Sequence, residues 1–260
     1  QGELLVTDGC NGAKYLVPVV IHVIYNPGDT NTNIKVAQIE AQIEKLNYFF
    51  RNGFNNKLPA VNTGIQFCLA KKDDHGNPIS GIYRVAAPSA SQHTRGDFDS
   101  LTSLSYISSQ KVVNIYVVEN ILSSRTGKVL GYATMPYLSP KNNMIVVCYD
   151  WFGDFSITGS PLNSTSNGLT LAHEMGHYFG LYHPFDFGCV GLEKTDCMTK
   201  GDLCCDVPAV ATENHVCPSS TENSCQEKYN GDPRDLKENL MDYSIHSCQN
   251  MFTPDQTNIM

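Results

Sequence analysis

Three histidines and a glutamate in one short stretch have the spacing of a metal site with a base beside it. The stretch reads His173-Glu174-Met175-Gly176-His177-Tyr178-Phe179-Gly180-Leu181-Tyr182-His183. Residues four apart on a helix lie nearly one above the other, so His173 and His177 can offer two imidazoles to one ion. Glu174 is rotated by about 100° from His173 and lies beside the ion, which suits a base acting on a coordinated water.

The end of the same stretch supplies a third ligand. Gly180 lets the chain leave the helix in a left-handed turn, after which His183 can return to the ion. Three protein ligands and one open position are typical of catalytic zinc. The alternative is a buried amphipathic helix whose histidines hydrogen-bond within the core, which would require all five positions to coincide by chance. We therefore predict zinc on His173, His177 and His183.

A second motif follows downstream and reads Asn239-Leu240-Met241-Asp242-Tyr243-Ser244. Taken alone, Met241 would be interpreted as a core methionine. A histidine motif of this form followed by a methionine-containing turn is the metzincin signature. Together with the segments 17–25, 130–136, 183–185 and 201–208, in this order, the chain resembles the pappalysin-type metzincins of peptidase family M43 over most of its length.

The resemblance implies a zinc-dependent endopeptidase that acts on proteins or peptides. Glu174 would take a proton from the coordinated water and deliver it to the leaving nitrogen. Met241 would form an apolar floor under the ligands. Tyr243 would help to stabilise the oxyanion, and its alternative role is a buried tyrosine that supports the turn. The strand Gly131-Tyr132-Ala133-Thr134 would run antiparallel to its neighbours and bind substrate by strand addition, with ordinary strand packing as the alternative.

The resemblance also implies a structural calcium site at Asp202 and Asp206, because the corresponding loop of the family binds calcium through oxygen ligands. Val207 departs from the family pattern, which has threonine there, and the alternative is a solvated acidic loop. Several relatives prefer a basic residue just after the cut and carry acids where this chain has Ile245 and His246. We therefore expect no strict arginine preference at that position, and we place His246 among the substrate contacts.

Ten cysteines are typical of an oxidised, secreted protein. Seven of them follow the histidine motif, in a segment rich in Gly, Asp, Asn and Ser that we expect to be loops joined by disulfides. A structural zinc site on four cysteines is the alternative, although no C-x-x-C pair occurs. The resemblance implies Cys217–Cys248, and pairs Cys225 with Cys197 or Cys189. Cys10 is expected in a disulfide, with latency through zinc binding as the alternative.

Composition limits the partners. The chain has 260 residues, 41% of them hydrophobic and 17% charged, which is typical of a globular protein. A net charge of -8 without a basic cluster argues against nucleic acid. No apolar run reaches membrane-spanning length. We expect a secreted monomer made as a precursor with a signal peptide and a propeptide, although no signal peptide is present at Gln1.

Hydrophobic periodicity gives the elements that must position the site. Val- and Ile-rich runs predict strands at 15–25, 63–70, 112–118, 130–135 and 143–149. Apolar residues three and four apart predict a helix at 34–52, and the histidine motif lies on a second helix. The expected class is α+β, a metzincin catalytic domain with a twisted, mixed five-stranded sheet and packed helices.

The expected organisation is two lobes around one cleft that holds the zinc. An upper lobe, 1–183, carries the sheet and the histidine helix, and a lower lobe, 184–260, carries the disulfides and the methionine turn. A second hypothesis is a catalytically silent binding or adhesion module with the same shell, and a third is a metal-dependent hydrolase of another bond. The intact histidines and Glu174 favour the peptidase.

Overall fold

The computed structural model describes residues 13–52, 60–108, 110–124, 127–136, 142–189, 194–213, 215–217, 221–226 and 233–260. Its contacts divide the chain into two compact units. The first comprises Gln1–Tyr48 and Gly64–Tyr178, and the second comprises Phe49–Thr63 and Phe179–Met260. No pattern in the sequence indicated that Phe49–Thr63 belongs with the C-terminal part. Cys10, for which a disulfide was predicted, lies outside the described residues.

A mixed sheet of six strands forms the first unit, in the order β2-β1-β5-β8-β7, with β3 also paired to β1. The strands are β1 (Tyr15–Tyr25), β2 (Ile65–Leu69), β3 (Ile82–Ala86), β5 (Val113–Val118), β7 (Gly131–Ala133) and β8 (Met144–Cys148). All of these pairs are parallel except β7 with β8. The predicted α+β class and mixed sheet are confirmed, and so is the antiparallel strand at 131–133.

The six strands fill only five places across the sheet, because β2 and β3 both pair with the same edge of the long strand β1. Its first half, 15–19, pairs with β2, and its last half, 21–25, pairs with β3. Every residue of β5 and β8 is buried, as expected for parallel strands covered on both faces. The short strand β3 was not predicted. Its five residues do not alternate between apolar and polar side chains, so they give no period-two hydrophobic pattern.

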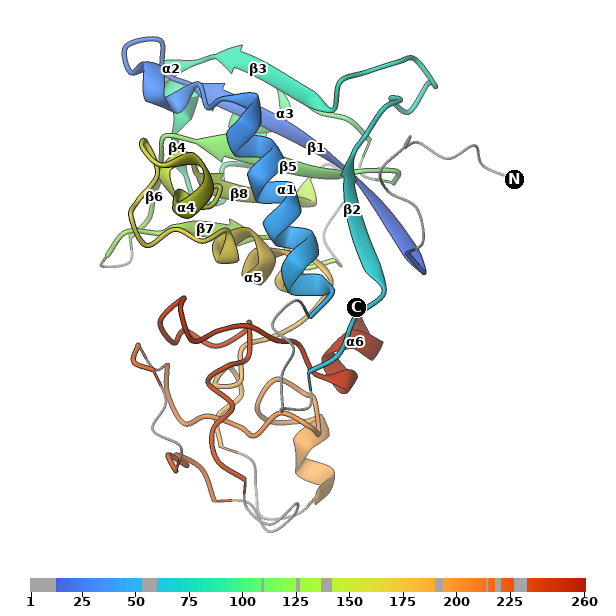
Figure 1. The fold of residues 1–260 in the computed structure, drawn as a ribbon, viewed down its shortest axis with the longest axis vertical. Helices are drawn as coiled ribbons and strands as arrows, with labels where there is room; N and C mark the ends of the chain where they lie inside the picture. The colour runs from blue at the N-terminus through green and yellow to red at the C-terminus, as the bar shows by residue number, and fades with distance from the viewer. Residues whose placement is uncertain are drawn as a thin grey trace. The chain divides into compact units, whose positions relative to one another are not determined.

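Helices cover the sheet (Figure 1). Helix α1 (Val36–Phe50) is anchored to β2 by Asn47, whose side chain donates to the carbonyl oxygen of Phe67 (2.9 Å) and accepts from its N–H (2.8 Å). Helix α5 (Leu169–Tyr178) carries the histidine motif and packs against β7 and β8. The shorter helices are α2 (Pro88–Ser91), α3 (Phe98–Thr102), α4 (Phe155–Thr158), and the 3-10 turns η1 (Thr30–Thr32) and η3 (Tyr149–Trp151).

A small parallel sheet of β4 (Gln92–Thr94) and β6 (Asn120–Leu122) lies outside the main sheet. It is joined to β7 by one buried hydrogen bond, 2.6 Å long, between His93 Nε2 and the Tyr132 hydroxyl. The two rings also stack, with centroids 5.9 Å apart. The Tyr132 side chain of the edge strand β7 is therefore held against His93 of the small sheet.

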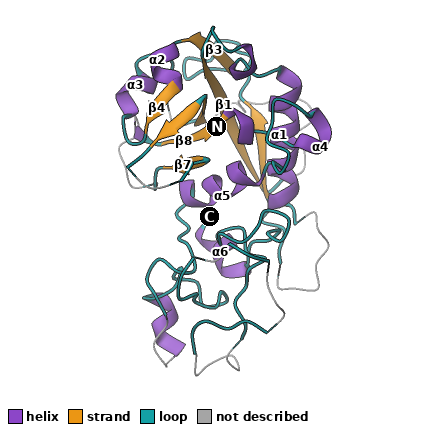
Figure 2. Ribbon diagram, turned by 90° about the vertical axis from the view of Figure 1, so that its left-hand side faces the viewer, coloured by secondary structure: helices purple, strands orange, loops and turns teal. Residues whose placement is uncertain are grey.

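The second unit consists mostly of loops and turns (Figure 2), with η4 (Lys194–Met198) and α6 (Pro254–Ile259) as its regular elements among the described residues. Three disulfides join these loops: Cys189–Cys225, Cys197–Cys205 and Cys217–Cys248. Two are pairs that the family resemblance implied, and the alternative Cys197–Cys225 is wrong. The disulfides also leave no set of four thiols for the alternative structural zinc site.

The pairing of Cys197 depends on local geometry. Cys204 and Cys205 are adjacent, and neighbouring side chains diverge, so only one of the two thiols faces Cys197. Cys205 makes the disulfide, and Cys204 remains a buried free thiol. A spacing argument has no means of choosing between two consecutive cysteines.

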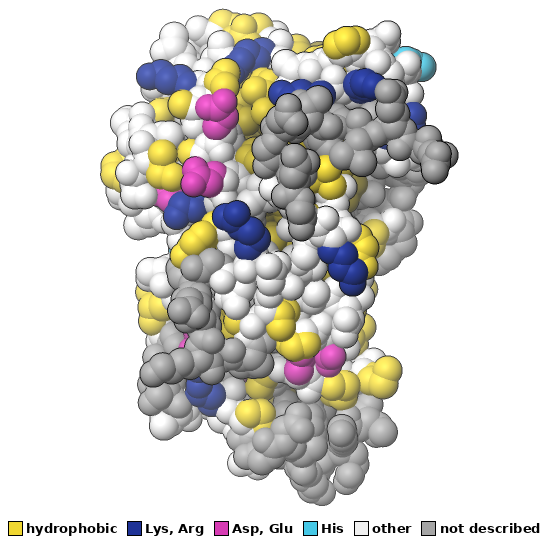
Figure 3. Space-filling view, turned by 45° about the vertical axis from the view of Figure 1, so that its right-hand side comes forward, with side chains coloured by type: hydrophobic (Ala, Val, Ile, Leu, Met, Phe, Trp, Pro, Cys, Tyr) yellow, Lys and Arg dark blue, Asp and Glu magenta, His cyan; other side chains and the backbone are white. Residues whose placement is uncertain are grey.

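Lysine and arginine side chains are scattered over the face in Figure 3 rather than gathered in one patch. No helix in the described part of the chain is long and apolar enough to cross a membrane.

Candidate active site

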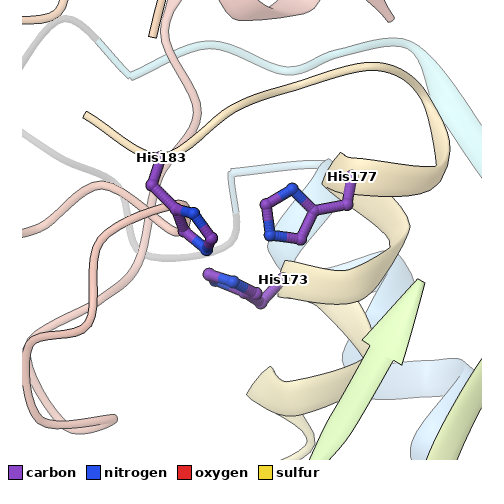
Figure 4. Close-up of side chains that lie close together, drawn as sticks. All are labelled: His173, His177 and His183. Carbon is purple, nitrogen blue, oxygen red and sulfur yellow. The ribbon is translucent and has the colours of Figure 1, made fainter. Parts of the chain in front are cut away.

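Helix α5 and the turn after it bring three imidazoles together (Figure 4). The ligand nitrogens of His173, His177 and His183 all lie within 4.8 Å of one another. The rings of His173 and His177 are one helical turn apart, with centroids separated by 4.8 Å. Gly180 has a φ of 99°, which is the predicted left-handed exit from the helix. The residues offer a metal ion three nitrogen donors on one side.

The third histidine is oriented by a carboxylate that the sequence argument missed. Asp186 accepts hydrogen bonds from the His183 backbone N–H (2.9 Å) and from its Nδ1 (3.0 Å). A carboxylate on Nδ1 fixes the tautomer and leaves Nε2 as the lone-pair donor, which is how metal-ligating histidines are usually held. The available signal was an aspartate three residues after the last histidine. This donor set fits a first-row divalent metal such as zinc.

Glu174 lies on the same helix and is only 8% exposed. Burial raises the pKa of its carboxyl to about 8, and the charge of Arg95 and the backbone N–H of Ala133 act in the opposite direction. The Ala133 N–H donates a hydrogen bond to this carboxylate. The edge strand β7 therefore contacts the proposed base directly.

Gly131 makes this contact possible. A methyl group at position 131 would lie 3.1 Å from Cγ2 of Thr170, 3.1 Å from the carbonyl oxygen of Val146 and 3.2 Å from Cγ of Glu174. Carbon atoms in contact normally lie about 3.5–4.0 Å apart, so a side chain at 131 would have to displace its neighbours by a few tenths of an ångström. The stem of Glu174 thus occupies the space that any other residue at 131 would fill.

The hydrogen bonds of β7 show which of its amides already have partners within the protein. The Thr134 N–H donates to the carbonyl oxygen of Met144 (3.0 Å), and its hydroxyl accepts from the Met144 N–H (2.9 Å). The Ala133 N–H is bound to Glu174. The Thr134 amide therefore pairs within the sheet and the Ala133 amide binds Glu174, and substrate pairing along 131–134 stays a prediction. The sequence could not show which amides faced β8, because that depends on the register.

The methionine turn is held from inside the second unit. Met241 is fully buried, and its N–H donates to the side-chain oxygen of Asn239 (2.8 Å). Asn239 in turn donates to Gln256 of α6 (2.8 Å). The Tyr243 ring lies edge-on to His183, with centroids 4.8 Å apart. Tyr243 thus lies against one of the three histidines of the cluster, and its role at the oxyanion stays a prediction.

Asp202 and Asp206 form no solvated loop. Asp202 is 2% exposed and accepts from the Cys204 N–H (3.0 Å) and the Gln256 amide (2.9 Å). Asp206 accepts from the Thr253 hydroxyl (2.7 Å) and from the N–H of Asp255 (2.9 Å). Among the residues that the structure describes, however, only the three histidines form a cluster of three or more His, Cys, Asp or Glu ligands.

Comparison with known proteins gives the family. Residues 100–260, more than half of the chain, match the model of peptidase family M43, described as pregnancy-associated plasma protein-A. The chain belongs to peptidase family M43. A relative from Arthroderma benhamiae named extracellular metalloprotease is 30% identical over 95% of this chain and 76% of its own length. Another from Arthroderma otae is 28% identical over 94% and 76%.

Solved M43 structures agree with the fold. Mature mirolysin of Tannerella forsythia, in complex with a cleaved peptide, superposes with a TM-score of 0.78 at 29% identity. The match covers 95% of this chain and 90% of that one. The predicted family and the predicted enzyme class, a metalloendopeptidase, are confirmed. Nothing in the comparisons supports the catalytically silent alternative.

Proposed function

We propose that this M43 chain is a secreted zinc endopeptidase in which His173, His177 and His183 hold the metal and Glu174 is the general base. The observation that carries the proposal is the convergence of three imidazoles from one motif, with a buried glutamate next to the first of them. Its relatives are named extracellular metalloproteases, and the disulfides of the second unit suit an oxidising compartment.

Zinc at this site would supply Lewis acidity, which favours ionisation of water near neutral pH and polarises a carbonyl. The protein's own groups handle the proton. Glu174 accepts it from the attacking water and returns it to the leaving nitrogen. The Ala133 N–H keeps the Glu174 carboxylate in one orientation. Asp186 holds the His183 ring, and Tyr243, whose ring lies against His183, would donate a hydrogen bond to the developing oxyanion.

We propose that substrates lie along Gly131-Tyr132-Ala133-Thr134, with the carbonyl groups of the strand rather than the Ala133 and Thr134 amides making the pairing. Ile245, 49% exposed, and the partly buried His246 offer no carboxylate to a basic side chain. We therefore propose a broad or apolar choice after the cut. Three expectations stay predictions: that the enzyme is a monomer, that its lobes are 1–183 and 184–260, and that it is made as a precursor.

Calcium at Asp202 and Asp206 also stays a prediction, and the surroundings of these carboxylates support it. Burial raises the pKa of Asp202 to about 7 and raises that of Asp206. The negative charge of Asp206 raises the pKa of Asp202 further, and the negative charge of Asp255 raises the pKa of Asp206. Their hydrogen-bond partners are neutral. A hard cation would offset this repulsion.

The test is cleavage-site profiling of a proteome-derived peptide library with Glu174→Gln as the inactive partner. Loss of the general base should lower kcat/KM by at least about 10²-fold, with zinc content unchanged. Glu40→Gln, at an exposed position of α1, is the matched control and should keep full activity. A Glu174→Gln protein that cleaves at the wild-type rate would refute the mechanism, and a profile dominated by arginine after the cut would refute the proposed preference.

A further inference from the structure

A cavity of about 460 Å³ opens where the small parallel sheet ends. Its walls are Thr94, Arg95, Leu122, Ser123 and Ser124. The two strands close it by pairing, since the Arg95 N–H donates to the carbonyl oxygen of Leu122 (2.9 Å). All of these residues belong to the first unit. The residues assigned so far to metal binding and proton transfer do not line this cavity.

The charge in this cavity is held in place. The guanidinium carbon of Arg95 lies 5.5 Å from the centre of the Tyr132 ring, a cation–π contact. Tyr132 is 4% exposed, and His93 holds its hydroxyl at 2.6 Å. The other ring nitrogen of His93 lies 3.3 Å from the Ser100 hydroxyl. Arg95 therefore rests on a buried ring that is itself fixed by a chain of hydrogen bonds.

The guanidinium retains its capacity to bind an anion. Within the part of the chain that the structure describes, Arg95 forms no ion pair with a carboxylate. Thr94 and Ser124 line the same cavity, and each carries a hydroxyl group that can donate a hydrogen bond. A fixed, unpaired guanidinium with hydroxyls beside it matches the two oxygens of a carboxylate.

The cavity is also close to the reaction. Tyr132, on which Arg95 rests, precedes Ala133, and the Ala133 N–H binds the Glu174 carboxylate. The Arg95 charge acts on that same carboxylate. A peptide bound along β7 would therefore pass within side-chain reach of Arg95.

We propose that this cavity is a specificity subsite that binds the carboxylate side chain of a substrate aspartate or glutamate near the cut bond. The inference rests on the proposed endopeptidase function and adds a substrate class to it. A chain with a net charge of -8 otherwise repels acidic peptides, so a local cation at the substrate strand would have a marked effect on selection. The role of Arg95 is to position substrate, and it takes no part in the proton transfers.

The test starts from the cleavage profile of the wild-type protein, which should show one position enriched in Asp and Glu. Two fluorogenic peptides, capped at both ends and differing only by Glu or Gln at that position, are then compared. Because Arg95 is exposed, the Glu peptide should have a kcat/KM higher by about fivefold at low salt, equivalent to about 1 kcal/mol. The difference should lie mainly in KM and should shrink in high salt.

Variants separate this role from a general change in charge. Arg95→Gln should bring the Glu/Gln ratio to about one, Arg95→Lys should keep part of it, and Arg95→Glu should favour a Lys peptide. Lys128→Gln removes the same charge from an exposed lysine paired with Asp150 and should leave the ratio unchanged. Comparing ratios cancels any effect of Arg95 on Glu174 that is common to both peptides.

Three results would overturn the inference: no acidic preference in an active enzyme, a ratio unchanged in Arg95→Gln, or an equal loss in Lys128→Gln. Discrimination seen only with peptides that have a free C-terminus would also overturn it, since the group bound would then be the terminal carboxylate. In each case cleavage would still depend on Glu174, so the proposed function would stand. If wild-type protein cleaves nothing, the proposed function itself fails first.

Discussion

Replacing Gly131 by alanine should slow catalysis without removing the metal ligands. The new methyl group would lie 3.2 Å from Cγ of Glu174 and 3.1 Å from both Cγ2 of Thr170 and the carbonyl oxygen of Val146. Normal contact needs about 3.5–4.0 Å, so the overlap is about 0.3–0.8 Å. Val146 is in the fully buried strand β8 and cannot retreat, whereas the Glu174 side chain can.

The magnitude follows from that overlap. A misplacement of about 1 Å costs up to about 10²-fold in rate, so a shift of about 0.5 Å in Glu174 should lower kcat by about tenfold. The crowding should also cost about 1–3 kcal/mol of stability. Gly131 does not have a positive φ, so alanine adds no backbone strain, and the effect reports packing alone.

The assay is steady-state cleavage of one peptide, with zinc content and melting temperature measured on the same samples. Gly28→Ala is the matched control, because a methyl group there meets only the side chain of Asn26. It should leave kcat unchanged. Wild-type kcat in a folded, zinc-loaded Gly131→Ala protein would show that the strand does not fix the position of Glu174, and the reasoning would fail.

Two further predictions concern stability. Burial lowers the pKa of His22 to about 4. Between that value and the ordinary histidine pKa of about 6.5, the imidazole is protonated in the unfolded chain but not in the folded one. The free energy of unfolding should therefore fall by about 2–3 kcal/mol between pH 7 and pH 4.5. His22→Gln, which can keep a donor to Asn114 and an acceptor for Ser105, should lose that part of the pH dependence in urea unfolding; parallel curves would contradict it. Calcium should raise the melting temperature of the wild-type protein, EGTA should reverse this with zinc retained, and Asp206→Asn should abolish the difference. Identical curves with and without calcium would exclude the site.

Local sequence patterns were sufficient to predict those features that depend only on residues close together in the chain. The histidine motif has its ligands four and six residues apart, so one helix and one turn determine their placement. Long apolar runs predicted β1, β5 and β8, because buried parallel strands need continuous hydrophobic residues. The helix at 36–50 followed from its three- and four-residue spacing in the same way.

Tertiary structure decided whatever depends on segments far apart in sequence. No local signal indicates that the N–H of Ala133 binds Glu174, that Gly131 leaves room for it, or that Arg95 rests on Tyr132. The choice of Cys205 over Cys225 as the partner of Cys197 is of the same kind. The sequence by itself predicted the family, and it gave the histidines and the glutamate proposed as metal ligands and base, because these lie within short motifs. Only the folded chain decided how the base is held and which charges face the substrate strand, because register and packing bring those residues together.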